Sequence, residues 1–416
     1  MIDEYAQLKK IIADTINTAA ITQTLNFDLF FQQMEGAFQS SGFRDDKSND
    51  EIKSIFLLHV GAAGDFVLTT PAIRTVRENF PGAFITLVVN EKIFKLAELC
   101  PYVNEVLPFN QKPIIDPLQN IILDAAIFSA EHLWKRRFDK AICLGFVNHV
   151  SRNFLMYFSG ARERCAWLFE EIDKIFITHC GLPSSKYKNH EVIINFYMLQ
   201  GYGLKTGNTD IEVWFNGADL YAARRLLKNF GEGRIKIAVS IGANSPARKY
   251  PIEKYLAAFK VLVDKGAALV IFGGPSELDD AKFLENNLPE GSVKNFVEVG
   301  AGWRVDVAAM SLTDMYIGNF TGACDIAAAL HKPVIALSRV ARDIKNFYDR
   351  LNEAERYRPW GTDSIIIQPE HQLEECRLKP NYQGCTAKKA HCIAQIEPSE
   401  IVDAFDKMLE VLREDF

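Results

Sequence analysis

The stretch HVGAAGDFVLTTPAIRTVRENFPGA (59–83) decides the fold, together with the apolar run IKSIFLL (52–58) that precedes it. A buried strand that passes through a glycine-rich turn into a helix is the usual start of a parallel α/β unit. In open parallel sheets, ligands bind beyond the carboxyl ends of the strands, which is where this turn lies. Gly61 and Gly64 let the backbone approach a ligand closely, and Asp65 follows them at the start of the helix.

Asp65 has two interpretations. Its side chain could cap the helix, a contribution of about 1 kcal/mol, or it could act as a general base. The turn lacks a dinucleotide fingerprint, because it offers only G-x-x-G followed by an acid, and no Gly-Lys-Ser/Thr follows to make a Walker loop. An acid at this helix start would also repel a pyrophosphate. The turn therefore favours an acceptor site over a phosphate site.

Strand-like and helix-like runs alternate along the rest of the chain. In the first half we expect strands at 52–60, 84–90, 104–109 and 138–146, with a helix over 67–80. The alternation restarts with strands expected at 235–242, 267–274, 314–319 and 332–338 and helices at 251–266 and 321–330. Two such halves predict two Rossmann-like α/β domains that face each other across a cleft.

The length of 416 residues exceeds one ordinary core and supports this division. We expect a helical extension and linker at 1–50, a first Rossmann-like domain at 51–217, a second at 218–396, and a helix at 397–416 that crosses back to the first domain. Apolar residues recur at helical spacing within 26–38, which fits an arm packed on the body or a contact in a homo-oligomer.

Composition narrows the function classes. A net charge of −6 argues against nucleic acid as a partner, since a broad phosphate-binding face would be basic. No run approaches 18 apolar residues, and MIDEYAQLKK (1–10) carries no signal core, so we expect a cytoplasmic protein, with peripheral contact to the inner membrane left open. Eight cysteines do not resemble a secreted disulfide scaffold.

The second half carries groups suited to a phosphate. SIGANSPARKYP (240–251) leaves a strand through three small or polar residues and then reaches two cations before a helix: Gly242, Ala243, Asn244, Arg248 and Lys249. Helix N-termini with open N–H groups favour anions, and GNFTGACD (318–325) presents the amides of Thr321 and Gly322 at another helix start. Two helix starts and two cations predict a diphosphate site.

Glu277 follows a strand in GGPSELDDA (273–281). It could accept hydrogen bonds from ribose hydroxyls, or it could simply place a negative charge in the first turn of its own helix.

With these motifs on both halves, the chain resembles the family 9 glycosyltransferases, the heptosyltransferase group with a GT-B fold, from about residue 52 to 405. The first-domain family pattern, which begins G-D-x-x-x-T-x-P, is similar to GDFVLTTPAIRTVRENFP (64–81), in which the threonine is Thr69. Three further family motifs are similar to GANSPARKYP (242–251), GGPSE (273–277) and HCIAQIEPSEIV (391–402).

The resemblance implies an inverting transfer of a sugar from a nucleoside-diphosphate donor, such as an ADP-heptose-like molecule, with Asp65 at the position of the family's base. It implies lipopolysaccharide, another surface glycan, a lipid-linked glycan or a protein as the acceptor. The chain contains no D-x-D stretch for a divalent cation, so we expect a metal-independent enzyme without a cofactor.

Two departures from the family pattern stand in the second half. The lysine of the family's K-x-W-P falls on Arg248, which keeps the charge and can clamp a phosphate bidentately. In D-[ST]-G-x-x-H, the aspartate falls on Phe320 and the histidine on Asp325. Asp325 could contact the donor sugar or ribose, or cap its helix. Phe320 and Asp325 also fit a degenerate, non-catalytic member that binds a nucleotide sugar or a partner protein, whereas Asp65 argues for an enzyme.

Two further stretches have alternative interpretations. Cys376, Cys385 and Cys392, with His391 nearby, could ligate a metal, but their spacings are not the paired C-x-x-C of zinc sites, so ordinary thiols are the simpler interpretation. The aromatic stretch HVSRNFLMYFSGARERCAW (149–167) could line an acceptor site, or it could be core with a basic rim.

Overall fold

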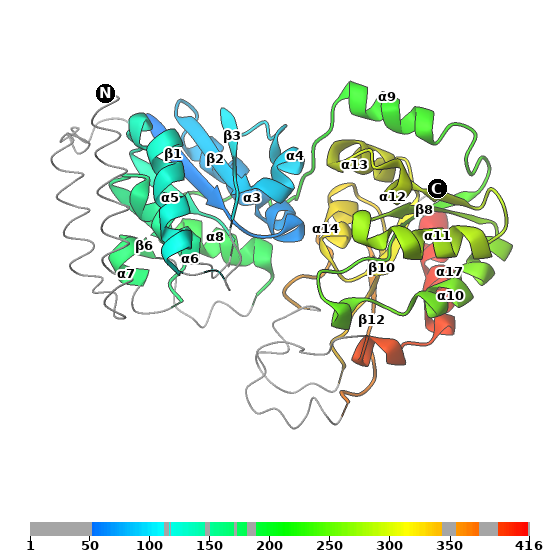
Figure 1. Cartoon of the computed structure of the whole chain (residues 1–416). Coiled ribbons are helices and arrows are strands. Elements are labelled where there is room, and N and C mark those ends of the chain that lie inside the picture. Colours follow the sequence, from blue (N-terminus) through cyan, green and yellow to red (C-terminus); the bar gives the residue numbers. More distant parts are fainter. Residues whose placement is uncertain are drawn as a thin grey trace. The chain divides into compact units, whose positions relative to one another are not determined.

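The computed structural model describes residues 52–111, 116, 118–145, 150–169, 173–180, 189–342, 355–373 and 390–414, so the predicted extension at 1–50 lies outside the described residues. The described residues form two parallel sheets of six strands each, which confirms the α/β fold class (Figure 1). The first sheet consists of β1 (Ser54–His59), β2 (Phe84–Asn90), β3 (Glu105–Phe109), β4 (Lys140–Cys143), β5 (Glu163–Ala166) and β6 (His179–Cys180). The second consists of β7 (Ile235–Ser240), β8 (Ala267–Phe272), β9 (Val293–Asn295), β10 (Met315–Asn319), β11 (Val334–Leu337) and β12 (Ser364–Ile367).

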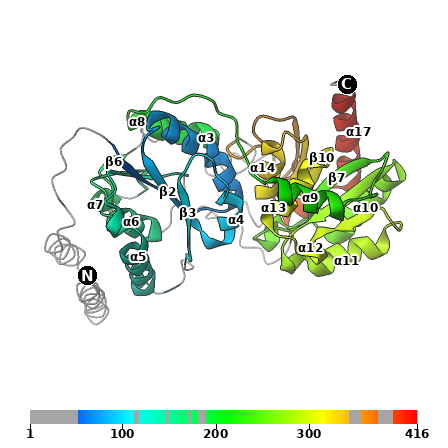
Figure 2. The same ribbon diagram turned by 90° about the horizontal axis from the view of Figure 1, so that it is seen from above.

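Helices connect the strands. The first half of the chain contains α3 (Ala63–Asn79), α4 (Phe94–Ala97), α5 (Leu118–His132), α6 (Val150–Phe158), α7 (Asp173–Phe176) and α8 (Glu191–Gly201). The second contains α9 (Gly217–Leu226), α10 (Ile252–Asp264), α11 (Leu278–Asn287), α12 (Phe296–Val299), α13 (Trp303–Ser311), α14 (Gly322–Ala329) and α17 (Pro398–Glu414). Helices α9 and α13 lie side by side (Figure 2).

Both sheets have the same doubly wound strand order. The first runs β3-β2-β1-β4-β5-β6 and the second, counted from the opposite edge, runs β9-β8-β7-β10-β11-β12. In each sheet the order reverses beside the first strand, between β1 and β4 and between β7 and β10. Crevices beyond the carboxyl ends of the strands at such switch points are where open α/β sheets bind ligands. The glycine-rich turn follows β1, and the predicted phosphate loops follow β7 and β10.

The aromatic stretch at 149–167 contributes core rather than an open surface. Phe154, Tyr157 and Phe158 belong to one buried cluster with Phe56 and Leu58 of β1. Two of the three arginines in this stretch are also buried, whereas Arg162 is exposed. Arg152 Nη2 lies 3.2 Å from Asp173 Oδ2, and Arg164 Nε donates to the carbonyl of Phe176 at 2.5 Å. This packing favours the core interpretation over an acceptor lining.

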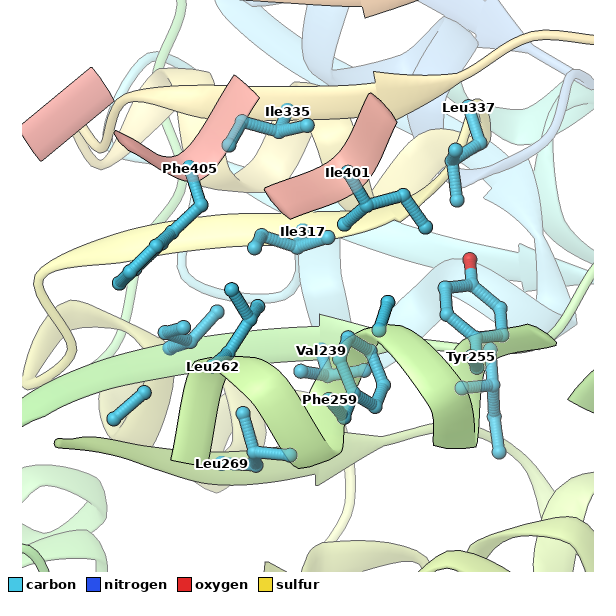
Figure 3. Close-up of a cluster of buried hydrophobic side chains, with 14 of the residues drawn as sticks. Val239, Tyr255, Phe259, Leu262, Leu269, Ile317, Ile335, Leu337, Ile401 and Phe405 are labelled. Carbon is cyan, nitrogen blue, oxygen red and sulfur yellow. The ribbon is translucent and has the colours of Figure 1, made fainter. Parts of the chain in front are cut away.

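The core of the second sheet includes the C-terminal helix. Ile401 and Phe405 of α17 pack with Ile317 and Ile335 of the sheet and with Phe259 of α10 (Figure 3). The expectation that residues 397–416 cross back to the first domain is therefore not met, because the apolar face of α17 is buried against the second sheet. Lys265, the residue directly after α10, also contacts α17: its Nζ lies 2.7 Å from Asp406 Oδ2.

Contacts divide the chain into two compact units that do not follow the predicted boundaries throughout. The second unit holds the second sheet, begins its continuous run at Thr209 rather than 218, and includes Ala63–Thr70, the first turns of α3. The short segment that ends at Glu191 also belongs to the second unit. The remainder of α3 and the first sheet belong to the first unit.

Candidate functional site

The starts of α3 and α14 touch through two glycines. A Cβ added to Gly322 would lie 2.5 Å from the backbone nitrogen of Gly64, and a Cβ added to Gly64 would lie 2.7 Å from Gly322 Cα and would clash with Asp325 Oδ2. Such distances are shorter than real Cβ contacts, so a larger residue at either position would push the two helix starts apart. The glycines of two sequence motifs that lie far apart in the chain thus make one close backbone contact.

This contact places a carboxylate beside the start of α14. Asp65 lies half-buried in the first turn of α3, one residue after the contact. Thr321 is the N-cap of α14 and makes no side-chain cap hydrogen bond, so it does not occupy the amides of the first turn. Partial positive charge at a helix N-terminus favours anions. The geometry therefore offers a proton acceptor next to a position suited to phosphate.

Asp325 lies on the buried side of the same contact. Its side chain is 6% exposed, and its Oδ1 has no hydrogen-bond partner among the described residues. Burial, and then the negative charge of Asp65, raise the pKa of the Asp325 carboxyl well above its usual range. Burial also raises the pKa of the neighbouring Cys324 thiol to about 12. Asp325 does not cap its helix, and this removes one of the two predicted roles.

A buried ion pair that sequence reasoning missed lies near Asp65. Arg356 Nε donates to Glu191 Oε2 at 2.8 Å, and its Nη2 lies 2.7 Å from the same oxygen. Burial opposes the charge of Arg356, but Glu191, Tyr357 and Asp65 together outweigh it and raise the pKa of the guanidinium. Burial and the charge of Glu191 likewise raise the pKa of the Tyr357 phenol. Arg356 therefore remains a cation whose field reaches Asp65.

Local pairing holds this ion pair in place. The backbone N–H of Glu191 donates to the carbonyl of Arg356 at 2.9 Å, and His190 Nε2 lies 2.9 Å from the carbonyl of Arg358. The His190 ring lies 4.3 Å from the Trp360 ring, and burial lowers the pKa of this histidine to about 4. Residues 190–191 and 356–360 thus form one packed unit, although they are far apart in sequence.

The loop after β7 is held to the end of β10 by Asn319. The fully buried Asn319 donates from Nδ2 to the carbonyl of Ile241 at 2.8 Å and to that of Gly242 at 3.2 Å. Its Oδ1 accepts from the Tyr250 backbone N–H at 3.1 Å and from the Tyr255 hydroxyl at 3.0 Å. Asn319 therefore positions both predicted phosphate loops, and the only sequence signal for it is its place at the end of a strand.

Glu277 and Gly242 also meet. A Cβ on Gly242 would lie 2.7 Å from Glu277 Cδ, so a larger residue there would displace this side chain. Glu277 Oε2 accepts from the Gly274 backbone N–H at 2.9 Å, and Oε1 accepts from the Ser276 hydroxyl at 2.7 Å. The carboxylate is thus ordered at the end of β8 beside the predicted donor loop.

The remaining predicted residues differ in how accessible they are. Asn244 is exposed and Ala243, Arg248 and Lys249 are half-buried, while Lys249 Nζ lies 2.5 Å from Asp280 Oδ2 on α11. Thr69 is fully buried and donates to the carbonyl of Phe66 at 2.7 Å, so its hydroxyl serves α3 instead of the predicted acceptor loop.

Two further residues belong to the motifs singled out in the sequence: Gly61 in the glycine-rich turn and Phe320 directly after β10. Gly61 is buried in the turn after β1. Phe320, at the position of the family's aspartate, is 7% exposed at the end of β10, and its backbone N–H donates to the carbonyl of Leu337 at 2.9 Å.

The proposed cysteine cluster is only partly described. Cys376 and Cys385 lie outside the described residues, while Cys392 Sγ lies 3.5 Å from His391 Nδ1. Within the described residues, no three histidine, cysteine or carboxylate side chains gather as metal ligands. The same residues include no helix with the length and apolar character needed to cross a bilayer.

Two doubly wound sheets in one chain define a GT-B-like α/β protein, and comparison with solved structures agrees. A family 9 glycosyl transferase from Veillonella parvula matches with a TM-score of 0.67 at 19% identity, covering 88% of this chain and 99% of that one. The Escherichia coli ADP-heptose lipopolysaccharide heptosyltransferase II matches with a TM-score of 0.62 at 18% identity, covering 87% and 100%.

The family follows from the sequence comparison. Residues 132–381 match the model of glycosyltransferase family 9 (heptosyltransferase), which is more than half of the chain. The chain belongs to this family, and it is a glycosyltransferase. It is 21% identical over 342 residues to lipopolysaccharide heptosyltransferase 2 of Escherichia coli, covering 75% of this chain and 94% of that protein. It is 23% identical over 294 residues to a putative glycosyltransferase of Haemophilus influenzae, covering 68% and 82%.

Proposed function

We propose that this glycosyltransferase moves a heptose or a related sugar from a nucleoside-diphosphate donor to a lipopolysaccharide-type glycan, with inversion at the anomeric carbon and with Asp65 as the general base. The close contact between Gly64 and Gly322 carries the proposal, because it sets the Asp65 carboxylate beside the start of α14. Similar proteins support the choice of substrates: one is a lipopolysaccharide heptosyltransferase, and another is an ADP-heptose lipopolysaccharide heptosyltransferase.

The donor diphosphate is assigned to the start of α14 and to the loop after β7. The amides at Thr321 and Gly322 face an anion favourably, and Arg248 can add a bidentate contact. Lys249 is ion-paired with Asp280, so we assign it a secondary role in which a bound phosphate would compete with that carboxylate. Glu277, ordered beside Gly242, is assigned to the ribose hydroxyls.

The reaction is a single displacement. The acceptor hydroxyl attacks the anomeric carbon as the bond from that carbon to the diphosphate oxygen breaks, and Asp65 takes the hydroxyl proton. Charge develops on the leaving diphosphate, where preorganised amides and a guanidinium stabilise it most. The guanidinium of Arg356 favours the ionised form of Asp65 and so keeps it ready to accept a proton.

The substitution Asp65→Asn tests the proposal. It removes the base without changing shape, so kcat should fall by about 10²–10⁴-fold, while ADP and donor binding persist. The measurement is transfer of sugar from ADP-heptose and from other nucleoside-diphosphate sugars to a lipopolysaccharide acceptor, with the anomeric configuration of the product read by NMR. Added chelator should leave the rate unchanged.

A matched control is Glu78→Gln, which neutralises an exposed carboxylate near the other end of α3 and should leave kcat unchanged. Equal rates for Asp65→Asn and wild type would refute the assignment of the base. The wild type could instead be as inactive as Asp65→Asn with every donor and yet be thermally stabilised by one of them. That result would support a nucleotide-sugar-binding protein, the alternative that fits Phe320 and Asp325.

A further inference from the structure

The Asp325 carboxyl occupies an environment that does not suit a negative charge. It lies in the first turn of α14 with 6% of its surface exposed, and its Oδ2 packs against Gly64. Its Oδ1 has no hydrogen-bond partner, and no ion pair to Asp325 is found in the described part of the chain. An ionised carboxylate that is buried without a partner is strongly unfavourable, whereas the protonated acid is tolerated.

The neighbours of Asp325 reinforce this preference. The ionisable groups around it and around Asp65 come from four segments: Asp65 on α3, Cys324 on α14, Glu191 at the start of α8, and Arg356 with Tyr357. The Cys324 thiol and the Tyr357 phenol stay neutral, because burial raises the pKa of each. Arg356 is the cation, but its guanidinium contacts Glu191 directly and its field reaches Asp65. Among these charged groups, the cation therefore supports Asp65, while Asp325 receives the negative field of Asp65; burial of Asp325 outweighs the favourable field of its own helix start.

We propose that Asp325 is the protonated member of a carboxyl pair with Asp65, and that it positions Asp65 as the base by leaving the single negative charge of the pair on Asp65. The inference rests on the proposed function of Asp65. Two carboxyls that interact strongly lose their protons in steps that belong to the pair, and the more exposed member, near Arg356, ionises first. Asp65 then takes the acceptor proton during transfer and releases it to water afterwards, while Asp325 keeps its own proton.

The first experiment measures the protonation state of Asp325 directly and does not depend on enzyme activity. Infrared difference spectra of the full chain at neutral pH compare wild type with Asp325→Asn. We expect the variant to lose the carbonyl stretch of a protonated carboxylic acid. The matched control is Asp219→Asn, because Asp219 is equally buried in a helix first turn but accepts from the Asn216 N–H and lies 3.3 Å from Arg304 Nε. That control should lose carboxylate bands only. Loss of carboxylate bands in Asp325→Asn would overturn the proposal.

The second experiment reads the role in catalysis, with ADP-heptose as the probe. Asp325→Asn is permanently neutral, so its role is read from the pH profile of kcat/KM, compared between the variant and wild type. In wild type, ionisation of Asp325 at higher pH would place a second negative charge beside the diphosphate, and kcat/KM should fall about tenfold per pH unit above that step. Asp325→Asn should lack this alkaline decline and keep the acidic one.

The outcomes separate the two proposals. A folded Asp325→Asn that is as slow as Asp65→Asn, or that keeps the alkaline decline, would overturn the role of Asp325. Full activity of Asp65→Asn would overturn the base itself, and the infrared spectra would still decide which carboxyl holds the proton.

Discussion

Helices α9 and α14 begin in similar ways and differ in how their first turns are satisfied. At α9, Asn216 Oδ1 accepts from the backbone N–H groups of Ala218 and Asp219 at 2.9 and 3.0 Å, and Asp219 returns the bond by accepting from the Asn216 N–H. At α14, Thr321 makes no side-chain cap bond, and the buried Asp325 leaves one oxygen without a partner among the described residues. Both aspartates are 6% exposed.

The difference shows which helix start is structural. The capping box of α9 closes that terminus with its own side chains and leaves nothing for a ligand. The start of α14 forgoes the stabilisation that a cap provides, about 1 kcal/mol, and keeps amides and a carboxyl next to Asp65. Local rules of this kind are broken most often at functional sites, which is why an unsatisfied helix start is informative.

The largest effect should come from adding one methyl group to the first residue of α14. In Gly322→Ala the new Cβ would meet the Gly64 backbone at 2.5 Å, so the starts of α3 and α14 must separate. Misplacement of reacting groups by an ångström reduces rates by about 100-fold, which is about 2.7 kcal/mol of barrier. We expect that loss in kcat/KM for sugar transfer.

Gly217→Ala is the matched control, because a Cβ at the first residue of α9 would meet nothing within 4 Å. Its activity should equal that of wild type. Equal activities of the two variants would remove the distinction between the two helix starts.

A smaller effect should appear in how stability depends on pH. Because the pKa of Asp325 is raised in the folded protein, the folded state binds more protons than the unfolded state above about pH 4. The free energy of unfolding should therefore fall as pH rises towards the folded pKa, with a slope of at most about 1.4 kcal/mol per pH unit from this group. Asp325→Asn should remove that slope, as measured by urea unfolding at several pH values.

Asp306→Asn provides a reference for the same measurement. Burial raises the pKa of Asp306, in the first turn of α13, to about 7, so its contribution should have the same sign and should end near pH 7. An Asp325→Asn variant with the wild-type pH dependence would contradict the protonated carboxyl at α14.

Much of the fold could be predicted because its signals are local. The long apolar runs at 84–90 and 314–319 match β2 and β10 within one residue at each end. Four short strands were not predicted: β5, β6, β9 and β12. They have two to four residues each, and each contains at least one residue that is not buried. In such strands the pairing with a neighbour decides the conformation more than the apolar pattern does.

The candidate site, like the fold, could be predicted only in part from the sequence. Glycine turns at strand ends are visible in the sequence, so the loops that carry Asp65, Gly242 and Gly322 could be located. The ion pair of Glu191 and Arg356 could not, because 165 residues separate the partners and neither lies in a recognisable motif. The unpartnered state of Asp325 is equally invisible, since it depends on what packs against the side chain. Sequence patterns indicate where loops begin, whereas long-range packing decides which charges they face.

The smallest effect should come from the satisfied side of the comparison. Asp219→Ala removes the return bond to the Asn216 N–H and the contact with Arg304, so the free energy of unfolding should fall by about 1 kcal/mol. The rate of sugar transfer should not change, because α9 supplies no group to the proposed site. Urea unfolding and kcat/KM measured on the same preparation give both readouts. If Asp219→Ala slowed transfer as Gly322→Ala does, a closed capping box would no longer identify a helix start as structural, and the interpretation of α14 as the functional one would lose its basis.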